Sequence, residues 1–580
     1  MKFNHKFKII IVSLGVLFGC ESIELDLTEN PNQLDPAQAS PDSYLNSIQV
    51  DYARLIGGPE GTTDITVGGL GDIAAQLTRI HNMFGRQYNQ AFGADAFDNE
   101  WTIAYAKILS DLARLYPLAE EENLPRHRAI GKTIEAFTLI NLTDFFGSIP
   151  YTEAIQGQEN LNPSLNTGEE IYTIAFGLLD EAEAAFEISE DDFVQDVDFD
   201  LYYGAGQGSG ADAEAWIRAI NSMRLKMYAQ TRLVNPDAVN QINAIIAEDN
   251  YISENSQDFQ FRWGANLANP DSRNPYYVYN YIATGANDYM SNYLMNYMLT
   301  DKVDNGNATF EGIDPRTRYY FYRQTDATPG AGGEPANQQN LSCSVEPAPA
   351  HYVNGGFTFC SIPGGYWGRD HGDDDGIPPD GLLRATWGVY PNGGRFDDSS
   401  FEEVNQGLGG GGAGITPIIL SSSIDFLRAE IALASGNTAD ARTLMLDGIT
   451  KSFAKVRSFG ALDVSADLTL AAPVSDDEDY IAEVGELYDA ADTMGKLGIL
   501  GEEFWVTLIG NGIDAYNFYR RVGAPFNLQP NLEPDPGEFA RSQFYPGVFA
   551  NNNSNVSQKS GVTERIFWDT NPETGFPIAN

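Results

Sequence analysis

A series of amphipathic segments constrains the fold of this chain more than any other feature. Apolar side chains recur with a period of about 3.6 residues, and Trp101, Ile108 and Leu115 share one such stripe. We expect helices at residues 94–118, 128–146, 169–186, 213–233, 426–434, 439–453, 494–509 and 512–521. Consecutive amphipathic helices with short connections predict antiparallel pairs, as in a degenerate helix repeat.

The middle of the chain has a different character. From about residue 250 to 415 Gly and Pro become frequent and aromatic residues cluster in turns. The glycine-rich run at 407–414 lacks the Gly-Lys-Ser/Thr ending of a phosphate loop. A stretch this long without regular elements is usually a functional surface. We therefore expect one mainly α domain over 44–580, with a helical scaffold at about 44–250 and 421–525 and a loop-rich ligand-binding lobe at about 251–420.

The start of the chain is typical of an export signal. Lys2, Lys6 and Lys8 precede an apolar run of ten residues at 9–18, which is too short to span a bilayer. Gly19 and Cys20 then complete a pattern that resembles a bacterial lipobox. The prediction is a signal peptide at 1–19, lipidation of Cys20 and a polar tether at 20–43, since two or more acyl chains anchor a protein stably. The alternative is an ordinary secretory signal with a chance cysteine.

The charge of the chain limits its partners. The net charge is −46, and removal of a signal with three lysines and no acids leaves about −49. Such a surface repels phosphate backbones and anionic headgroups, so nucleic acid is not an expected partner. Polyanionic glycans are disfavoured unless a local basic patch overrides the field. Neutral or cationic cargo is mildly favoured.

Two further cysteines flank a loop rich in Gly and Pro. Cys343 and Cys360 are the only pair left once Cys20 is assigned to lipid. A disulfide between them would stabilise the fold by about 3 kcal/mol in an oxidising compartment. The alternative is two reduced cysteines.

The sequence contains no recognisable catalytic motif. Neither His-Glu-x-x-His nor Gly-x-Ser-x-Gly occurs, so we expect a protein that is not an enzyme and needs no cofactor. Asp373, Asp374 and Asp375 lie in an acidic loop and provide the oxygen ligands that calcium prefers. The spacing is not that of an EF-hand. The other interpretation, favoured here, is a loop of Asx turns in which carboxylates cap backbone amides.

Aromatic residues are the main candidates for ligand binding. A sugar ring has an apolar face and a rim of hydroxyls, so its site needs flat aromatics together with amides, carboxylates and arginines. The predicted ligand-binding residues are Trp263, Tyr276, Tyr289, Trp367, Arg369, Asp370, His371 and Trp387. Trp367 and Trp387 adjoin glycines and are expected to form an exposed platform. Most of the lobe's tyrosines are expected to fill its own core, and Trp101, Trp216 and Trp505 to fill the core of the scaffold.

Six short segments resemble one family in order along nearly the whole chain. They lie at residues 30–32, 144–154, 216–225, 368–381, 426–430 and 519–525. With the lipobox they resemble the SusD/RagB-like nutrient-binding outer-membrane lipoproteins of Bacteroidetes, in particular the SusD-like_2 branch. The resemblance implies a scaffold of four helix pairs of tetratricopeptide type and an irregular lobe that carries the ligand surface.

The resemblance also implies a role. Such proteins sit on the outer face of the outer membrane as the lid of a SusC-like TonB-dependent transporter and capture a poly- or oligosaccharide for import. Two other functions stay open. The cargo is an oligopeptide in one, which would need backbone pairing and a charge pocket. In the other the protein is a structural partner of the transporter, which predicts buried Trp367 and Trp387 and no open pocket.

Overall fold

A computed structural model gives the fold. It describes residues 39–58, 68–83, 85, 87–204, 208–268, 270–283, 285–300, 313–326, 353, 362, 364–373, 381–533, 535–572 and 574–578. These residues form many α-helices and two sheets of two short strands each, which confirms the mainly α fold class. No helix in these ranges is both long and apolar enough to cross a bilayer.

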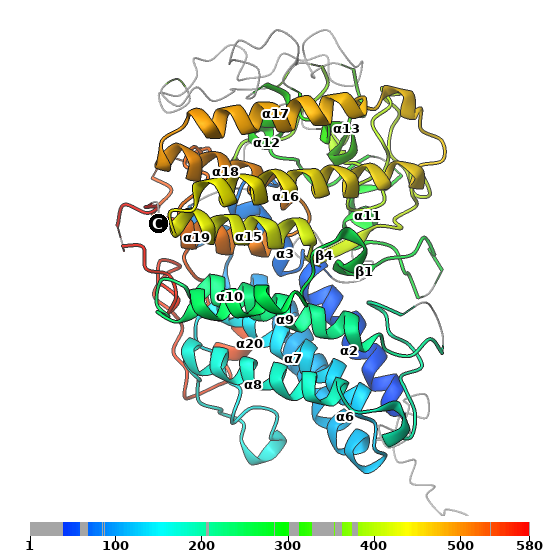
Figure 1. Ribbon diagram of the computed structural model, residues 1–580, viewed down its shortest axis with the longest axis vertical. Coiled ribbons are helices and arrows are strands. Elements are labelled where there is room, and N and C mark those ends of the chain that lie inside the picture. Colours follow the sequence, from blue (N-terminus) through cyan, green and yellow to red (C-terminus); the bar gives the residue numbers. More distant parts are fainter. Residues whose placement is uncertain are drawn as a thin grey trace, which may run out of the picture.

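Paired helices build the first half of the scaffold, in the lower part of Figure 1. The longer ones are α2 (Pro41–Gly57), α6 (Ser110–Glu121), α7 (Pro125–Phe146), α8 (Gly168–Phe186), α9 (Ala213–Thr231) and α10 (Ala238–Glu248). Helix α2 packs on α6, α7 on α8, and α9 on α10. Shorter elements connect them: α3 (Leu70–Leu77), α4 (Tyr88–Ala91), η2 (Ala94–Phe97), α5 (Asp98–Thr102), η3 (Ile103–Leu109), η4 (Gly157–Glu159) and η5 (Glu190–Asp192).

Two predicted boundaries in this half are wrong. Helix α2 begins at Pro41, inside the predicted tether, because the Ser40 hydroxyl accepts a hydrogen bond from the Ser43 N–H and Pro41 fits the first helical position. The single helix predicted at 94–118 is four elements in succession, one of them the π-helical turn η3.

The second half of the scaffold lies in the upper part of Figure 1. It consists of α15 (Ser421–Ala434), α16 (Thr438–Ser458), α17 (Val474–Ala490), α18 (Thr493–Thr507) and α19 (Gly512–Val522), with η9 (Gly460–Leu462) and η10 (Leu468–Leu470). Helix α15 packs on α16, α17 packs on both α16 and α18, and α18 also packs on α15. The short helix α20 (Gly547–Ala550) lies in the C-terminal segment.

Short elements and loops connect the two halves. Strand β1 (Phe259–Arg262) pairs antiparallel with β4 (Ile415–Ile419), and β2 (Phe321–Tyr322) pairs antiparallel with β3 (Thr386–Trp387). The helices here are η6 (Asn255–Gln257), α11 (Pro275–Asn280), α12 (Asn292–Thr300) and α13 (Thr317–Tyr320). Strands β1 and β4 lie at the two ends of the lobe in the sequence. Their pairing brings these two ends together beside the scaffold.

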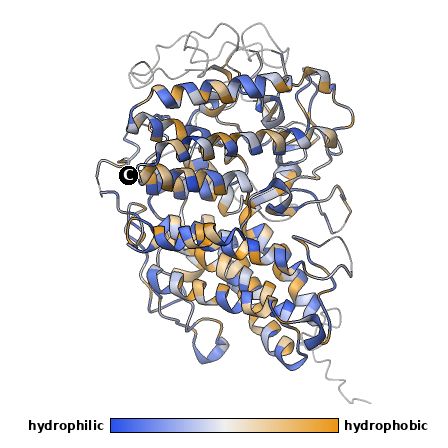
Figure 2. Cartoon of the chain, viewed as in Figure 1, coloured by the Kyte–Doolittle hydropathy of each residue, from blue (hydrophilic) through white to orange (hydrophobic). Residues whose placement is uncertain are grey.

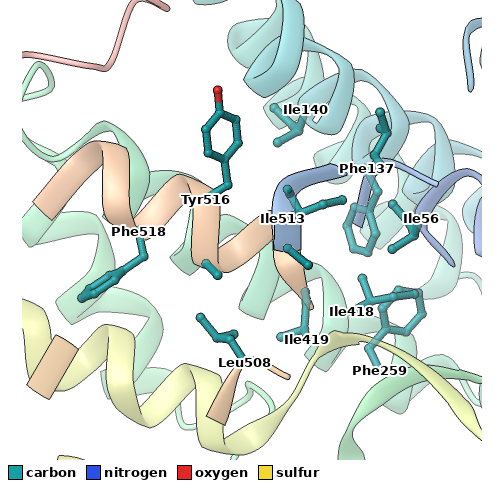
Figure 3. Packing of buried hydrophobic residues seen from close by; sticks show 14 of the residues in the cluster. Ile56, Phe137, Ile140, Phe259, Ile418, Ile419, Leu508, Ile513, Tyr516 and Phe518 are labelled. Carbon is teal, nitrogen blue, oxygen red and sulfur yellow. The ribbon is translucent and has the colours of Figure 1, made fainter. Parts of the chain in front are cut away.

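The core runs without a break through both halves. Figure 3 shows Phe137 of α7, Phe259 of β1 and Ile513 of α19 in one apolar layer, and all three side chains are buried. Hydrophilic residues lie on the outward faces of the helices in Figure 2, as the amphipathic pattern requires. Trp101, Trp216 and Trp505 are buried in this core, which confirms their predicted place.

Candidate functional site

A pocket of about 430 Å³ opens between the first helical half and the lobe. Phe92, Tyr279 and Tyr289 provide aromatic walls. Its charged lining residues are Asp72, Asp288, Arg369 and Arg384. The pocket therefore combines flat apolar surfaces with hydrogen-bonding groups of both signs, which is the composition of a small polar-ligand site.

Three segments that are far apart in the sequence form one wall of this pocket. His81 bridges Met290 as antiparallel neighbours do, and the Asn82 N–H donates to the Tyr289 carbonyl at 3.2 Å. On the other side the Arg369 N–H donates to the Met290 carbonyl at 3.1 Å. Backbone pairing alone thus brings residues 81, 290 and 369 side by side.

Gly368 allows its segment to pack closely against the backbone of Met290. A Cβ atom at this position would lie 1.9 Å from the carbonyl oxygen of Met290, which no side chain tolerates. The Gly368 N–H also donates to the side-chain oxygen of Asn292 at 2.9 Å. A glycine is needed here so that the next residue, Arg369, reaches the pocket.

Tyr289 supports the two arginines of the pocket. The guanidinium carbons of Arg369 and Arg384 lie 4.0 and 3.4 Å from the centre of its ring. Arg369 also donates to the Tyr289 hydroxyl at 3.1 Å, and Arg384 donates to the Asn287 carbonyl at 3.0 Å. Cation–π contacts of this kind orient guanidinium groups. Since the guanidinium groups occupy ring surface, they leave less of the Tyr289 face free for a sugar.

Two acidic residues, Asp72 and Asp288, also line the pocket. Asp72 accepts a hydrogen bond of 2.7 Å from the Nδ1–H of His81, and Asp288 accepts one of 2.7 Å from the side chain of Asn280. Burial and, to a smaller extent, the charge of Asp72 raise the pKa of Asp288 to about 6, against the opposing charges of His81 and Arg384. The carboxyl group of Asp288 therefore does not ionise freely in the pocket.

One known protein family matches the first part of the chain. Residues 32–345 match the SusD-like_2 family, described as starch-binding and associating with the outer membrane. The match spans more than half of the chain.

The chain belongs to this family.

Solved structures of SusD proteins share the fold at low sequence identity. A SusD/RagB family protein from Bacteroides thetaiotaomicron is 14% identical with a TM-score of 0.64, over 92% of this chain and 99% of that one. A chitin-binding SusD homolog from Flavobacterium johnsoniae is 18% identical with a TM-score of 0.59, over 92% and 99%. A SusD homolog from Bacteroides uniformis is 17% identical with a TM-score of 0.57, over 91% and 99%. The sequence matches no curated protein.

The prediction that Trp367 and Trp387 form an exposed platform in this SusD-like protein is wrong. Trp367 is 0% and Trp387 is 1% exposed. The indole N–H of Trp367 donates to the Leu383 carbonyl at 3.0 Å, while Trp387 packs edge-on against His81 behind the pocket wall. In the sequence, the neighbouring glycines, Gly368 and Gly388, favour exposed tryptophans. In the structure they instead let their own backbone approach that of Met290 and Tyr319 closely. Trp263 is also buried, and its N–H donates to the Thr416 hydroxyl at 2.8 Å.

Only part of the predicted ligand set lies at the pocket. Tyr289 and Arg369 line it. Asp370 and His371 instead face the body of the protein, where Gln529 donates to Asp370 at 2.7 Å and His371 shares a 3.1 Å hydrogen bond with the Tyr88 hydroxyl. Burial and the charge of Arg79 hold the pKa of His371 well below its usual value. These two residues therefore fasten the loop rather than line the pocket.

The remaining predicted residues lie behind the pocket or outside the described part. Tyr276 is half-buried and packs against both His81 and Trp387. Cys20, Cys343, Cys360, Asp374 and Asp375 lie outside the described residues, so the lipid, disulfide and calcium expectations stay predictions. Within the described residues, Asp373 included, no group of three or more His, Cys, Asp or Glu side chains is arranged to hold a metal ion.

Sequence reasoning missed most of the residues that line the pocket. Asp72 lies in the first turn of α3, His81 and Asn82 follow that helix, and Phe92 follows α4. No local pattern distinguishes these four from scaffold residues. Asp288 and Arg384 lie in the lobe but carry no motif. Tyr279 belongs to a conspicuous tyrosine cluster, and that cluster was the one signal that pointed to this wall.

Proposed function

We propose that this protein binds a nutrient glycan at the cell surface and serves as the lid of a TonB-dependent outer-membrane importer. The family assignment supports association with the outer membrane and binding of starch-like ligands. The pocket itself carries the glycan part of the proposal, because it combines aromatic walls with carboxylates and arginines. The protein acts by binding, without catalysis or a required cofactor.

The volume and chemistry of the pocket suit one or a few sugar units. A volume of about 430 Å³ falls within the usual range for small-ligand sites. The half-buried ring of Tyr279 presents apolar surface for the face of a sugar ring. Asn287 and the guanidinium groups above Tyr289 provide polar groups for the hydroxyl rim.

Affinity electrophoresis through a panel of polysaccharides tests the proposal. The chain from Glu21 onward, which retains every described residue, is run through native gels that contain neutral or amino-sugar polymers. We expect retardation by at least one polymer. If no glycan retards the protein and an oligopeptide panel binds instead, the cargo is peptide and the glycan proposal fails.

The Tyr279→Ala variant shows where the glycan binds. Loss of an aromatic wall removes stacking of about 1–2 kcal/mol, so we expect affinity to fall roughly tenfold. The matched control is Tyr228→Ala on α9, a half-buried tyrosine that stacks on Phe176 outside the pocket. Equal losses in both variants would contradict binding at the pocket.

The lid role needs a partner and an anchor. Affinity purification of the tagged, lipidated chain from its native outer membrane should retain a SusC-like transporter. The Cys20→Ala variant should lose its membrane anchorage and be released in soluble form. A membrane-bound Cys20→Ala protein would contradict lipidation at that residue.

A further inference from the structure

We infer that Asp288 makes this pocket selective for neutral sugars, because its carboxylate lies beside two arginines that would otherwise bind an acidic sugar. The inference rests on the proposed glycan-binding function and names the substrate class of the same pocket. It is carried by one short segment, residues 287–290, which brings charges of both signs together at the pocket.

This segment positions both arginines of the pocket. The Arg384 side chain donates to the Asn287 carbonyl at 3.0 Å, and the Arg369 backbone N–H donates to the Met290 carbonyl at 3.1 Å. The Tyr289 ring lies against both guanidinium groups. Both arginines line the pocket. Because a guanidinium group matches a carboxylate in charge and geometry, this side of the pocket would attract a uronic acid.

The same segment fixes an acid next to these arginines. Asp288 follows Asn287, whose carbonyl Arg384 contacts. The Asn280 side-chain oxygen accepts the Asp288 N–H at 2.8 Å, and the Asn280 side-chain nitrogen donates to the Asp288 carboxylate at 2.7 Å. Burial raises the pKa of Asp288 and the charge of Arg384 opposes this rise, so the two side chains are close enough to interact. With Asp72, the pocket contains two acids and two arginines.

This balance of charges determines which sugars the pocket favours. An anionic sugar would be attracted by the arginines but repelled by Asp288, whereas a neutral sugar is not repelled. Asn82 also favours hydroxyl groups. Among the residues that the structure describes, its side-chain oxygen has no hydrogen-bond partner, although the side chain is only 7% exposed. A hydroxyl can donate to this oxygen and an ionised carboxylate cannot. Repulsive groups contribute to specificity in this way as much as attractive ones.

The first test compares tetrasaccharides that differ only at carbon 6. Calorimetric titration of the chain from Glu21 uses α-1,4- and β-1,4-linked glucose tetramers and the corresponding glucuronic acid tetramers, at pH 8 and low salt. We expect a glucose tetramer to bind at least tenfold more tightly than its acidic counterpart. Equal or tighter binding of an acidic tetramer overturns the inference and leaves the glycan-binding proposal intact. If none of the four binds, the inference is overturned, and the polysaccharide panel decides the glycan-binding proposal separately.

The Asp288→Asn variant assigns the selectivity to this residue. Its effect must be separated from that of the net charge of −46, which also disfavours acidic sugars. The new amide oxygen can still accept the hydrogen bond from Asn280. We expect the ratio of acidic to neutral affinity to rise at least tenfold in this variant. The control Glu486→Gln removes one charge from an exposed position on α17 and should leave the ratio unchanged. An unchanged ratio in a folded Asp288→Asn protein overturns the inference.

The pH dependence gives a readout on the unaltered protein, which decides the matter if the variant does not fold. The pKa of Asp288 is about 6, so its charge is largely lost between pH 8 and pH 5, whereas the sugar carboxylate stays ionised. The other charged or titratable groups around it are Asp72, His81, Arg369 and Arg384.

Protonation of Asp288 removes a repulsive charge. Affinity for the acidic tetramers should therefore rise several-fold as the pH falls from 8 to 5, with protons taken up on binding, while affinity for the glucose tetramers changes far less. A flat profile overturns the inference. A rise of the same size in Asp288→Asn would assign the titration to another group, His81 first, and would also overturn it.

Discussion

Glu100 is a buried acidic residue close to the pocket residue Asp72. Its side chain is 1% exposed, and burial raises its pKa to about 7 from an ordinary value of 4.5. A carboxyl group with a raised pKa binds protons more tightly in the folded state, so its ionisation opposes folding. The cost begins above pH 4.5 and is fully present above pH 7.

The Glu100→Gln variant should remove this cost. We expect its free energy of unfolding to exceed that of the wild-type protein by about 2–3 kcal/mol at pH 8, with the difference shrinking toward zero near pH 5. Urea denaturation at both pH values measures the difference. A variant that is equally destabilised at pH 5 and pH 8 would show that the carboxyl group stabilises through packing or hydrogen bonds instead.

Site residues were predictable only where chemistry and local composition coincide. Arg369 and Tyr289 were found because they lie in an aromatic and glycine-rich stretch. Trp367 was wrongly predicted to be exposed. A glycine beside a tryptophan can lie in an exposed loop or can allow two backbone segments to pack closely, and the sequence does not distinguish the two cases. His81 was missed since its place beside Met290 depends on pairing across about two hundred residues, which no local pattern encodes.

At the scale of elements, buried polar side chains hold the helices together. Glu430 on α15 receives hydrogen bonds of 2.9 and 2.6 Å from Arg521 on α19 and one of 2.8 Å from Arg232, just after α9. Burial would raise the pKa of Glu430, but the two arginines outweigh it and lower the value. Two of the segments that resemble the family, at 426–430 and 519–525, therefore meet in one ion cluster.

The Glu430→Gln variant should destabilise the protein strongly. Removal of the shared carboxylate leaves two buried guanidinium groups without a counter-charge, which typically costs about 3–5 kcal/mol. Asp489→Asn is the control, because its ion pair with Arg442 is largely exposed and should matter by less than about 1 kcal/mol. Chemical denaturation of both variants measures the contrast. Similar midpoints for the two would contradict a structural role for the cluster.

Helix periodicity identified most of the longer helices but missed others, among them α10 and α17. Helix α17 was not predicted, because its first turn carries Asp476 and Asp477 and its buried face is interrupted by acidic side chains. Helix α15 was predicted to start at residue 426 but begins at Ser421. The structure supplies a distant cap, in which Asp258 accepts the hydrogen bond from the Ser421 N–H at 2.7 Å. Tertiary partners of this kind are invisible to a local pattern.

For the whole molecule, the excess of acid is the dominant physical property. The chain has 81 Asp and Glu residues against 35 Lys and Arg. Repulsion among like charges destabilises the compact state and is screened by salt, with a Debye length of about 10 Å at 0.1 M and 3 Å at 1 M. The melting temperature should therefore rise by a few degrees between low salt and 1 M NaCl.

A thermal scan across salt concentrations measures this effect. The increase should be the same in NaCl and KCl, since screening depends on ionic strength rather than on the identity of the cation. A constant melting temperature would contradict a net repulsive surface. A rise in only one of the two salts would indicate a specific cation site instead.

The contacts of Asp144 on α7 have a consequence for how the chain is made. Its carboxylate accepts hydrogen bonds from Trp568 at 2.9 Å and from Asn517 at 2.6 Å, and its backbone carbonyl accepts one from Arg520 at 2.8 Å. A ribosome releases Asp144 long before it releases Trp568. Although Tyr172, a fourth partner, is made early, the other three are made only near the end of synthesis. Nascent chains that lack the C-terminal segment therefore cannot satisfy this buried acid. Folding of this protein belongs to the end of its synthesis or to the time after it.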